Sequence, residues 1–152
     1  MPETKRRASL NFFQGADGPT LMFLMFEDAD LSGLKALFLG LANGEHKKVS
    51  LRAAGIVGFA SAIDDVVFMR FVDGDEPSRM VRKVRDTLRG PLFEFRRHKE
   101  GWLECAELIE GLTGPGHQYL SRGLGDDALV MVSYREGLAE RGGPTGDAER
   151  RT

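Results

Sequence analysis

Apolar and polar residues follow one another in stretches that are typical of short strands and amphipathic helices. Two apolar stretches, 9–14 and 20–27, flank the turn-forming sequence GADGP, which predicts a β-hairpin. The run LMFLMF within the second stretch predicts a strand buried on both faces. Leucines then recur at helical spacing between Asp30, an expected N-cap, and an Asn-Gly stop at 43–44, so we expect a helix there.

The rest of the chain continues with strand and helix patterns. The segments 47–53, 66–72 and 91–97 predict strands, the first with Val49, Leu51 and Ala53 on one face. A second amphipathic helix is expected over 100–114, because glutamates face away from an apolar stripe. That stripe consists of Trp102, Cys105, Ala106, Ile109 and Leu112. Two short strands, within 117–120 and 128–134, are expected to close the domain.

The segment 75–91 has two readings. Asp75 as a cap, Pro77 in the first turn and a Gly90–Pro91 stop favour a helix, since apolar residues from Met80 to Leu88 share one helical arc. The alternative for residues 77–89 is a strongly charged hairpin. We predict the helix.

Together these elements predict an α+β fold, with a mainly antiparallel sheet of about six to seven strands and two to three helices packed on it. We expect one domain over residues 8–135. Residues 1–7 are polar and basic, and residues 136–152 are rich in glycine and charge, so both ends are expected to be disordered.

Composition narrows the class of protein. The chain has 152 residues, a net charge of −2 and one cysteine, Cys105, which excludes an internal disulfide and any CxxC motif. No signal-peptide pattern precedes the first strand, and the longest apolar run is too short to span a bilayer. We therefore expect a cytoplasmic protein without membrane association.

Charge is concentrated in one segment. Residues 78–99 contain eight basic and two acidic residues, a net of +6 in an otherwise acidic chain. A solvated face is the common reason for such a run, and docking to an acidic partner is the functional alternative. Nucleic acid is an unlikely ligand, because the sequence pI is about 5.9 and no aromatic residues are interleaved on that face. The candidate binding residues in this segment are Arg79, Arg82, Lys83, Arg85, Arg89, Arg96 and Arg97.

Three further side chains are candidates for the same surface. Trp102 lies on an apolar helical stripe, so core packing is its default role and an interface the alternative. His117 follows a Gly-Pro-Gly break and is expected to hold that loop by a hydrogen bond to a backbone carbonyl. Tyr119 is expected near solvent at a strand edge.

No catalytic, metal or cofactor motif is present. The three histidines, His46, His98 and His117, are far apart in sequence, and no nucleophile elbow or phosphate loop occurs. Burial and nearby carboxylates should raise the pKa of the Cys105 thiol, which makes a reactive thiolate improbable. We therefore expect no catalytic residues, no metal and no cofactor.

The last third of the chain, GWLECAELIEGL followed by GHQYL and DDALVMVSY, resembles small bacterial α+β proteins of uncharacterised families. Some of these are similar to immunity proteins, which bind and neutralise a partner toxin. No catalytic motif comes with the resemblance, so it implies a bacterial protein that works by binding.

Two functions follow from these observations. The leading hypothesis is a non-enzymatic domain that binds another protein, or itself as a homodimer, through the basic segment. The alternative is a small-ligand-binding domain or minor enzyme with a site around His117, Tyr119 and Asp126.

Overall fold

The computed structural model describes residues 7–16, 18–60, 62–71, 81–122 and 128–136. Most of the two expected terminal segments, and the positions Asp75, Arg79 and Asp126, lie outside the described residues. The described elements, in chain order, are β1 (Ser9–Gly15), β2 (Gly18–Met25), α1 (Asp28–Ala42), β3 (Lys48–Ser50), α2 (Leu51–Ala54), β4 (Gly58–Phe59), β5 (Asp65–Arg70), β6 (Val81–Thr87), β7 (Gly90–Arg97), α3 (Lys99–Glu110), β8 (Gly116–Arg122) and β9 (Leu129–Tyr134).

The fold is α+β, as expected, but the described strands form two sheets, of five and four strands, instead of one sheet of six to seven. Sheet A has the order β4-β1-β2-β9-β8, and sheet B has the order β3-β5-β7-β6. Both sheets are mixed, because β2 runs parallel to β9 and β5 runs parallel to β7. Each sheet has one strongly apolar face, and two sheets that face one another bury both of these faces in one core.

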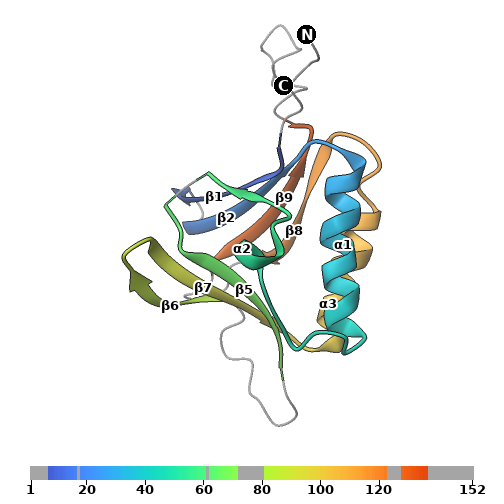
Figure 1. Cartoon of the computed structure of the whole chain (residues 1–152). Coiled ribbons are helices and arrows are strands. Elements are labelled where there is room, and N and C mark those ends of the chain that lie inside the picture. Colours follow the sequence, from blue (N-terminus) through green and yellow to red (C-terminus); the bar gives the residue numbers. More distant parts are fainter. Residues whose placement is uncertain (1–6, 17, 61, 72–80, 123–127, 137–152) are drawn as a thin grey trace, which may run out of the picture.

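The two long helices complete this core. α1 and α3 pack against each other on one side of the molecule, and the two sheets lie on the other side (Figure 1). The inner faces of the sheets meet where the rings of Phe23 on β2 and Phe68 on β5 lie 6.2 Å apart. The outer face of each sheet therefore points away from the core.

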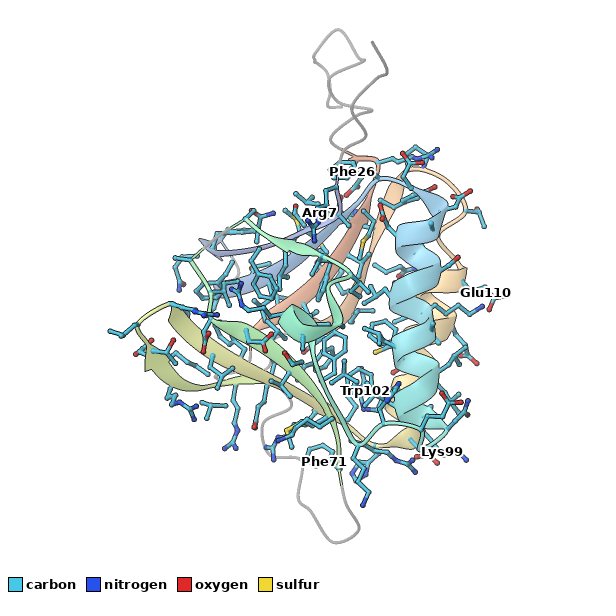
Figure 2. The ribbon with its side chains drawn as sticks, in the orientation of Figure 1. Arg7, Phe26, Phe71, Lys99, Trp102 and Glu110 are labelled. Atoms are coloured by element: carbon cyan, nitrogen blue, oxygen red, sulfur yellow. The ribbon has the colours of Figure 1, made fainter. Side chains whose placement is uncertain are left out.

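An aromatic cluster joins α1, α3 and sheet B. The Trp102 ring on α3 stacks on Phe38 of α1 at 5.5 Å and contacts Phe68 and Phe95 of sheet B. Its indole N–H donates to the Met69 carbonyl at 3.1 Å, so the one polar atom of the side chain is satisfied. Figure 2 shows Trp102 among the side chains between the helices and the sheets.

Two helix starts differ from the sequence expectation. α1 begins one turn earlier than the Asp30 cap implied, with Glu27 as N-cap, and the Asp30 carboxylate accepts from the backbone N–H of Glu27 at 2.9 Å. The strand expected over 47–53 ends at Ser50, because the Ser50 hydroxyl caps α2 by accepting from the Ala53 N–H at 3.1 Å. A side-chain cap thus ends the strand before Leu51.

The helix predicted over residues 77–89 is wrong. Residues 81–87 form β6, which pairs antiparallel with β7, so the charged hairpin is the correct alternative. Gly90, which we interpreted as part of a helix stop, adopts a φ of +121° where β7 begins. Only glycine reaches this conformation without strain, which makes the same residue a hairpin signal.

Candidate functional site

The basic segment does not form one continuous surface. Arg82 pairs with Glu94, and their Nη2 and Oε1 atoms lie 3.1 Å apart. Lys83 lies opposite Phe93, on the other face of sheet B. Arg89 lies in the exposed turn between β6 and β7. Strand alternation thus sends neighbouring basic residues to opposite sides of the sheet.

Arg97 has a structural role. Its Nη1 donates to the Leu120 carbonyl at 2.9 Å, and its Nη2 lies 2.9 Å from Glu104 Oε1 on α3. Its side chain is 15% exposed. The guanidinium therefore ties β7 to α3 and β8, and it is poorly placed to meet a partner.

Three of the predicted basic residues do share a surface, the outer face of sheet B. The strand register places the face in three rows of directly opposed residues. These rows are Arg85-Leu92-Asp65, Arg82-Glu94-Val67-Ser50 and Arg96-Met69-Lys48. Four basic and two acidic side chains give this face a net charge of +2, so most of the positive charge counted along the sequence is dispersed elsewhere.

Trp102 belongs to the core. Its side chain is 0% exposed, which confirms the packing role that its place on the helical stripe indicated. It is therefore not available to a binding partner in this structure.

His117 and Tyr119 lie together on β8, with their ring centroids 5.5 Å apart in an edge-on arrangement. The His117 Nδ1 lies 2.8 Å from the Glu136 carboxylate, where we had expected a backbone carbonyl as its partner. The other oxygen of Glu136 accepts from the Ser133 hydroxyl at 2.8 Å. This order differs from a hydrolase triad, because the serine donates to the carboxylate and no base among the described residues contacts its oxygen.

The outer face of sheet A has a composition that sequence reasoning missed. The LMFLMF run is not buried on both faces: Leu21, Phe23 and Met25 point inward, whereas Met22 and Leu24 are only half-buried. The register again defines three rows. They are Ser9-Leu24-Ser133-His117, Asn11-Met22-Met131-Tyr119 and Phe13-Thr20-Leu129-Arg122. Arg122 ends the third row on the edge strand β8, and we call the other eleven positions the sheet A face.

The sheet A face contains no lysine, arginine, aspartate or glutamate among these eleven positions. Phe13 is 40% exposed, Met22, Leu24, Met131 and Tyr119 are half-buried, and the Thr20, Leu129 and Ser133 side chains between them are buried. The helices α1 and α3 lie on the opposite, inner side of the sheet, where they pack against the core (Figure 1). The face is therefore an apolar surface with a few neutral polar groups. The sequence signal for this face was the alternation of side chains between the two sides of β1 and β2. That alternation identifies an exposed face only when it is known which side of the sheet the core covers.

The sulfur of Cys105 is inert. The side chain is 0% exposed, and burial raises the pKa of its thiol to about 12, an effect that the neighbouring Arg97 guanidinium only partly offsets. Among the described residues no group of three or more histidine, cysteine or acidic side chains is arranged to hold a metal ion. In the same part of the chain, no helix has the length and apolarity needed to cross a membrane.

Comparisons with models of protein families, with curated proteins and with solved structures found no match to this chain. The candidate site therefore rests on its own geometry.

Proposed function

We propose that the protein is a non-enzymatic interaction domain that docks a partner protein on the sheet A face. The observation that carries the proposal is that these eleven positions hold no lysine, arginine, aspartate or glutamate, in a chain of which 29% is charged, and that Arg122 lies only at the end of the third row, on the edge strand. Depletion of charge, with methionine and aromatic residues in its place, is the compositional mark of an interface core. The resemblance to small bacterial binding proteins points in the same direction.

The size of the face favours a partner other than a second copy. Four strands about 4.8 Å apart and three rows about 6.8 Å apart cover roughly 400 Å². Two identical faces stacked on each other would bury about 800 Å² in total, below the roughly 1,200 Å² of a stable interface. A different protein can extend over the rim of the sheet, where the His117–Glu136 pair supplies hydrogen-bonding groups.

The test compares two methionines that are alike in exposure. Met131→Glu places a charge in the middle row of the sheet A face, and Met69→Glu places it in the outer face of sheet B. Both residues are half-buried strand residues, so their effects on folding should be similar. After a partner has been captured from cells and purified, we expect Met131→Glu to weaken binding at least 100-fold and Met69→Glu to leave it unchanged, because an unpaired charge in an interface is costly. Equal affinity of the two variants would refute the proposal.

A second docking surface is favoured by the three arginines on the outer face of sheet B. The Arg85 guanidinium makes no hydrogen bond or ion pair with any described residue, so it is free to meet a carboxylate. If an acidic partner binds there, reversing the charges of Arg82 and Arg85 should weaken binding and reduce its salt dependence while folding is retained. Unchanged affinity in that double variant would exclude this surface.

A further inference from the structure

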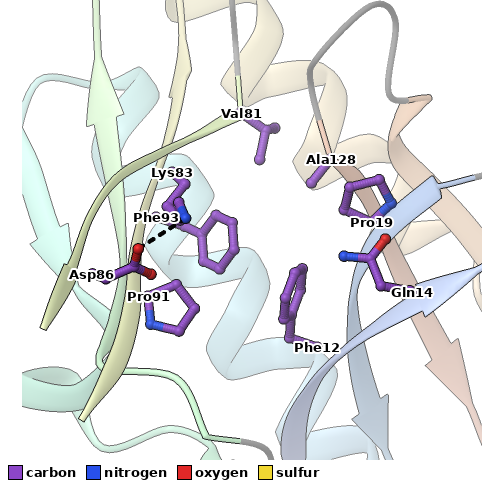
Figure 3. Close-up of a pocket in the computed structure, with 9 residues that line it drawn as sticks. All are labelled: Phe12, Gln14, Pro19, Val81, Lys83, Asp86, Pro91, Phe93 and Ala128. Atoms are coloured by element: carbon purple, nitrogen blue, oxygen red, sulfur yellow. Dashed lines mark hydrogen bonds and ion pairs between the residues drawn. The ribbon is translucent and has the colours of Figure 1, made fainter. Parts of the chain in front are cut away.

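A cleft opens between the two sheets, at the end away from the helices (Figure 3). It has a volume of about 370 Å³. One wall comes from β1 and β2 and the other from β6 and β7, while Ala128 lies just before β9. The rings of Phe12 and Phe93, one from each sheet, meet with centroids 4.9 Å apart. Most of the remaining wall is apolar, formed by Pro19, Val81, Pro91 and Ala128.

Three polar side chains complete the lining: Gln14 on one wall, and Lys83 and Asp86 on the other. The Lys83 ammonium and the Asp86 carboxylate lie 3.0 Å apart, and their side chains are 50% and 68% exposed, so the ion pair lies at the rim (Figure 3). The pair contributes no net charge. One N–H of Lys83 is used on Asp86, which leaves further donors on the ammonium and a further acceptor oxygen on the carboxylate.

A β-bulge brings the pair together. In a regular strand, residues three apart point to opposite faces, so Lys83 and Asp86 would be separated by the sheet. The register with β7 shifts between Lys83 and Arg85, which leaves Val84 without a partner and turns Asp86 back to the face of Lys83. Bulges of this kind redirect side chains beside binding sites.

We propose that this cleft binds a small molecule with a flat apolar body and a zwitterionic end, the chemistry of a free α-amino acid with an aromatic side chain. The apolar body packs against the Phe12 and Phe93 rings, which contact each other, and against Pro19 and Pro91. The carboxylate of the ligand accepts from Lys83, and its ammonium donates to Asp86, so each charge at the rim acquires a second partner. The volume lies within the range of small-molecule sites. This site lies on the inner faces of the sheets and is independent of the sheet A face.

The first experiment titrates the protein with three probes of similar size and different charge, followed by NMR cross-peaks of residues that line the cleft. Phenylalanine carries both charges, phenylacetate only the negative one and phenethylamine only the positive one. We expect saturable binding of phenylalanine in the millimolar range or below, and at least tenfold weaker binding of the two others, because each lacks one charged hydrogen bond. Equal binding of all three probes, or none, would overturn the proposal.

Two adjacent residues supply matched variants. Gln14 and Phe13 are neighbouring exposed residues of β1 that point to opposite faces of sheet A. Gln14→Trp fills the mouth of the cleft and should abolish phenylalanine binding, whereas Phe13→Trp adds the same side chain outside and should leave it unchanged. The double variant Lys83→Ala/Asp86→Ala keeps the net charge and should weaken phenylalanine binding at least tenfold. Retention of full binding in either the Gln14 or the double variant would place the ligand elsewhere. Met131→Glu should not affect this binding, so the result is separate from that for the docking surface.

Discussion

Replacement of Trp102 by phenylalanine tests the central packing of the fold. The indole is 0% exposed and its N–H donates to the Met69 carbonyl. Loss of that hydrogen bond should cost about 1 kcal/mol, because the buried carbonyl loses its partner. The smaller ring leaves roughly 40 Å³ empty, which at about 24 cal/mol per Å³ adds about 1 kcal/mol. We therefore expect the free energy of unfolding to fall by about 2 kcal/mol.

Urea denaturation followed by far-UV circular dichroism measures this change without relying on tryptophan fluorescence. The variant should remain folded, since small domains are stable by about 5–15 kcal/mol, and its m-value should be unchanged. Leu88→Ala is the control, because Leu88 is fully exposed at 108% and its loss should matter by less than about 0.5 kcal/mol. If Trp102→Phe were as stable as the control, Trp102 would not be packed in the core as the structure shows, and an interface role would be the better explanation for this residue.

Three further predictions concern single positions. Burial raises the Cys105 pKa from 9.0 to about 12, so the folded state holds the thiol proton more tightly than the unfolded chain. The contribution of this thiol to the free energy of unfolding should be complete below pH 9 and should fall by up to about 4 kcal/mol as the pH rises towards 12. Urea midpoints should therefore decrease less steeply with pH in Cys105→Ala than in the original protein. Gly90→Ala should lower the free energy of unfolding by about 2 kcal/mol or more, because the φ of Gly90 is +121° and a Cβ there would lie 2.5 Å from the Ala62 carbonyl oxygen. In the control Gly33→Ala, the added Cβ on α1 meets nothing within 4 Å, so this variant should be neutral or stabilising in the same thermal or urea unfolding experiment. Arg97→Ala should lose about 2 kcal/mol of stability and Arg85→Ala less than about 0.5 kcal/mol; similar losses would show that Arg97 does not tie β7 to its neighbours.

The sequence correctly predicted those helices and strands whose local pattern of apolar residues matches the way they pack in the fold. The hairpin of β1 and β2, the helices α1 and α3, and the final strand pair all appear close to their expected places. In α3 the expected stripe is the buried one, with Trp102, Cys105, Ala106 and Ile109 among its residues. A helix with a well-separated apolar stripe has only one way to bury it, so its sequence determines its orientation.

The segment that became β6 lacked such agreement. Its apolar residues fit a helical arc, but among those that the structure describes only Val81 is buried, while Val84 is 36% exposed at the bulge and Leu88 is fully exposed in the turn. Pairing with β7, the next strand along the chain, decided the conformation, and the helical spacing of apolar residues within one segment does not show that pairing. Edge strands often carry lysine, arginine and a bulge, which protect them from pairing with other chains, and the same features imitate a charged helix.

The candidate surfaces were less accessible to sequence reasoning than the fold. The charge of the basic segment was counted along the chain, yet a strand divides its side chains between two faces. Arg82 and Arg85 therefore point outward, whereas Lys83 enters the cleft. The sheet A face could not be recognised from LMFLMF alone, because a run of apolar residues does not indicate whether a second layer covers the strand.

The two outer faces make opposite predictions for the effect of salt on partner binding. The eleven positions of the sheet A face hold no lysine, arginine, aspartate or glutamate, and Arg122 and Glu136, which have opposite charges, lie at its border. The affinity of a partner bound there should therefore change less than about threefold between 50 and 500 mM salt. The outer face of sheet B carries a net +2, and salt screens exposed charges over about 10 Å at 0.1 M and about 3 Å at 1 M, so an acidic partner there should lose at least tenfold. Measurement of the captured partner's affinity by calorimetry across this range separates the two surfaces without any mutation. A steep salt dependence would contradict docking on the sheet A face even if Met131→Glu also weakened binding, because a destabilised sheet could produce that loss indirectly.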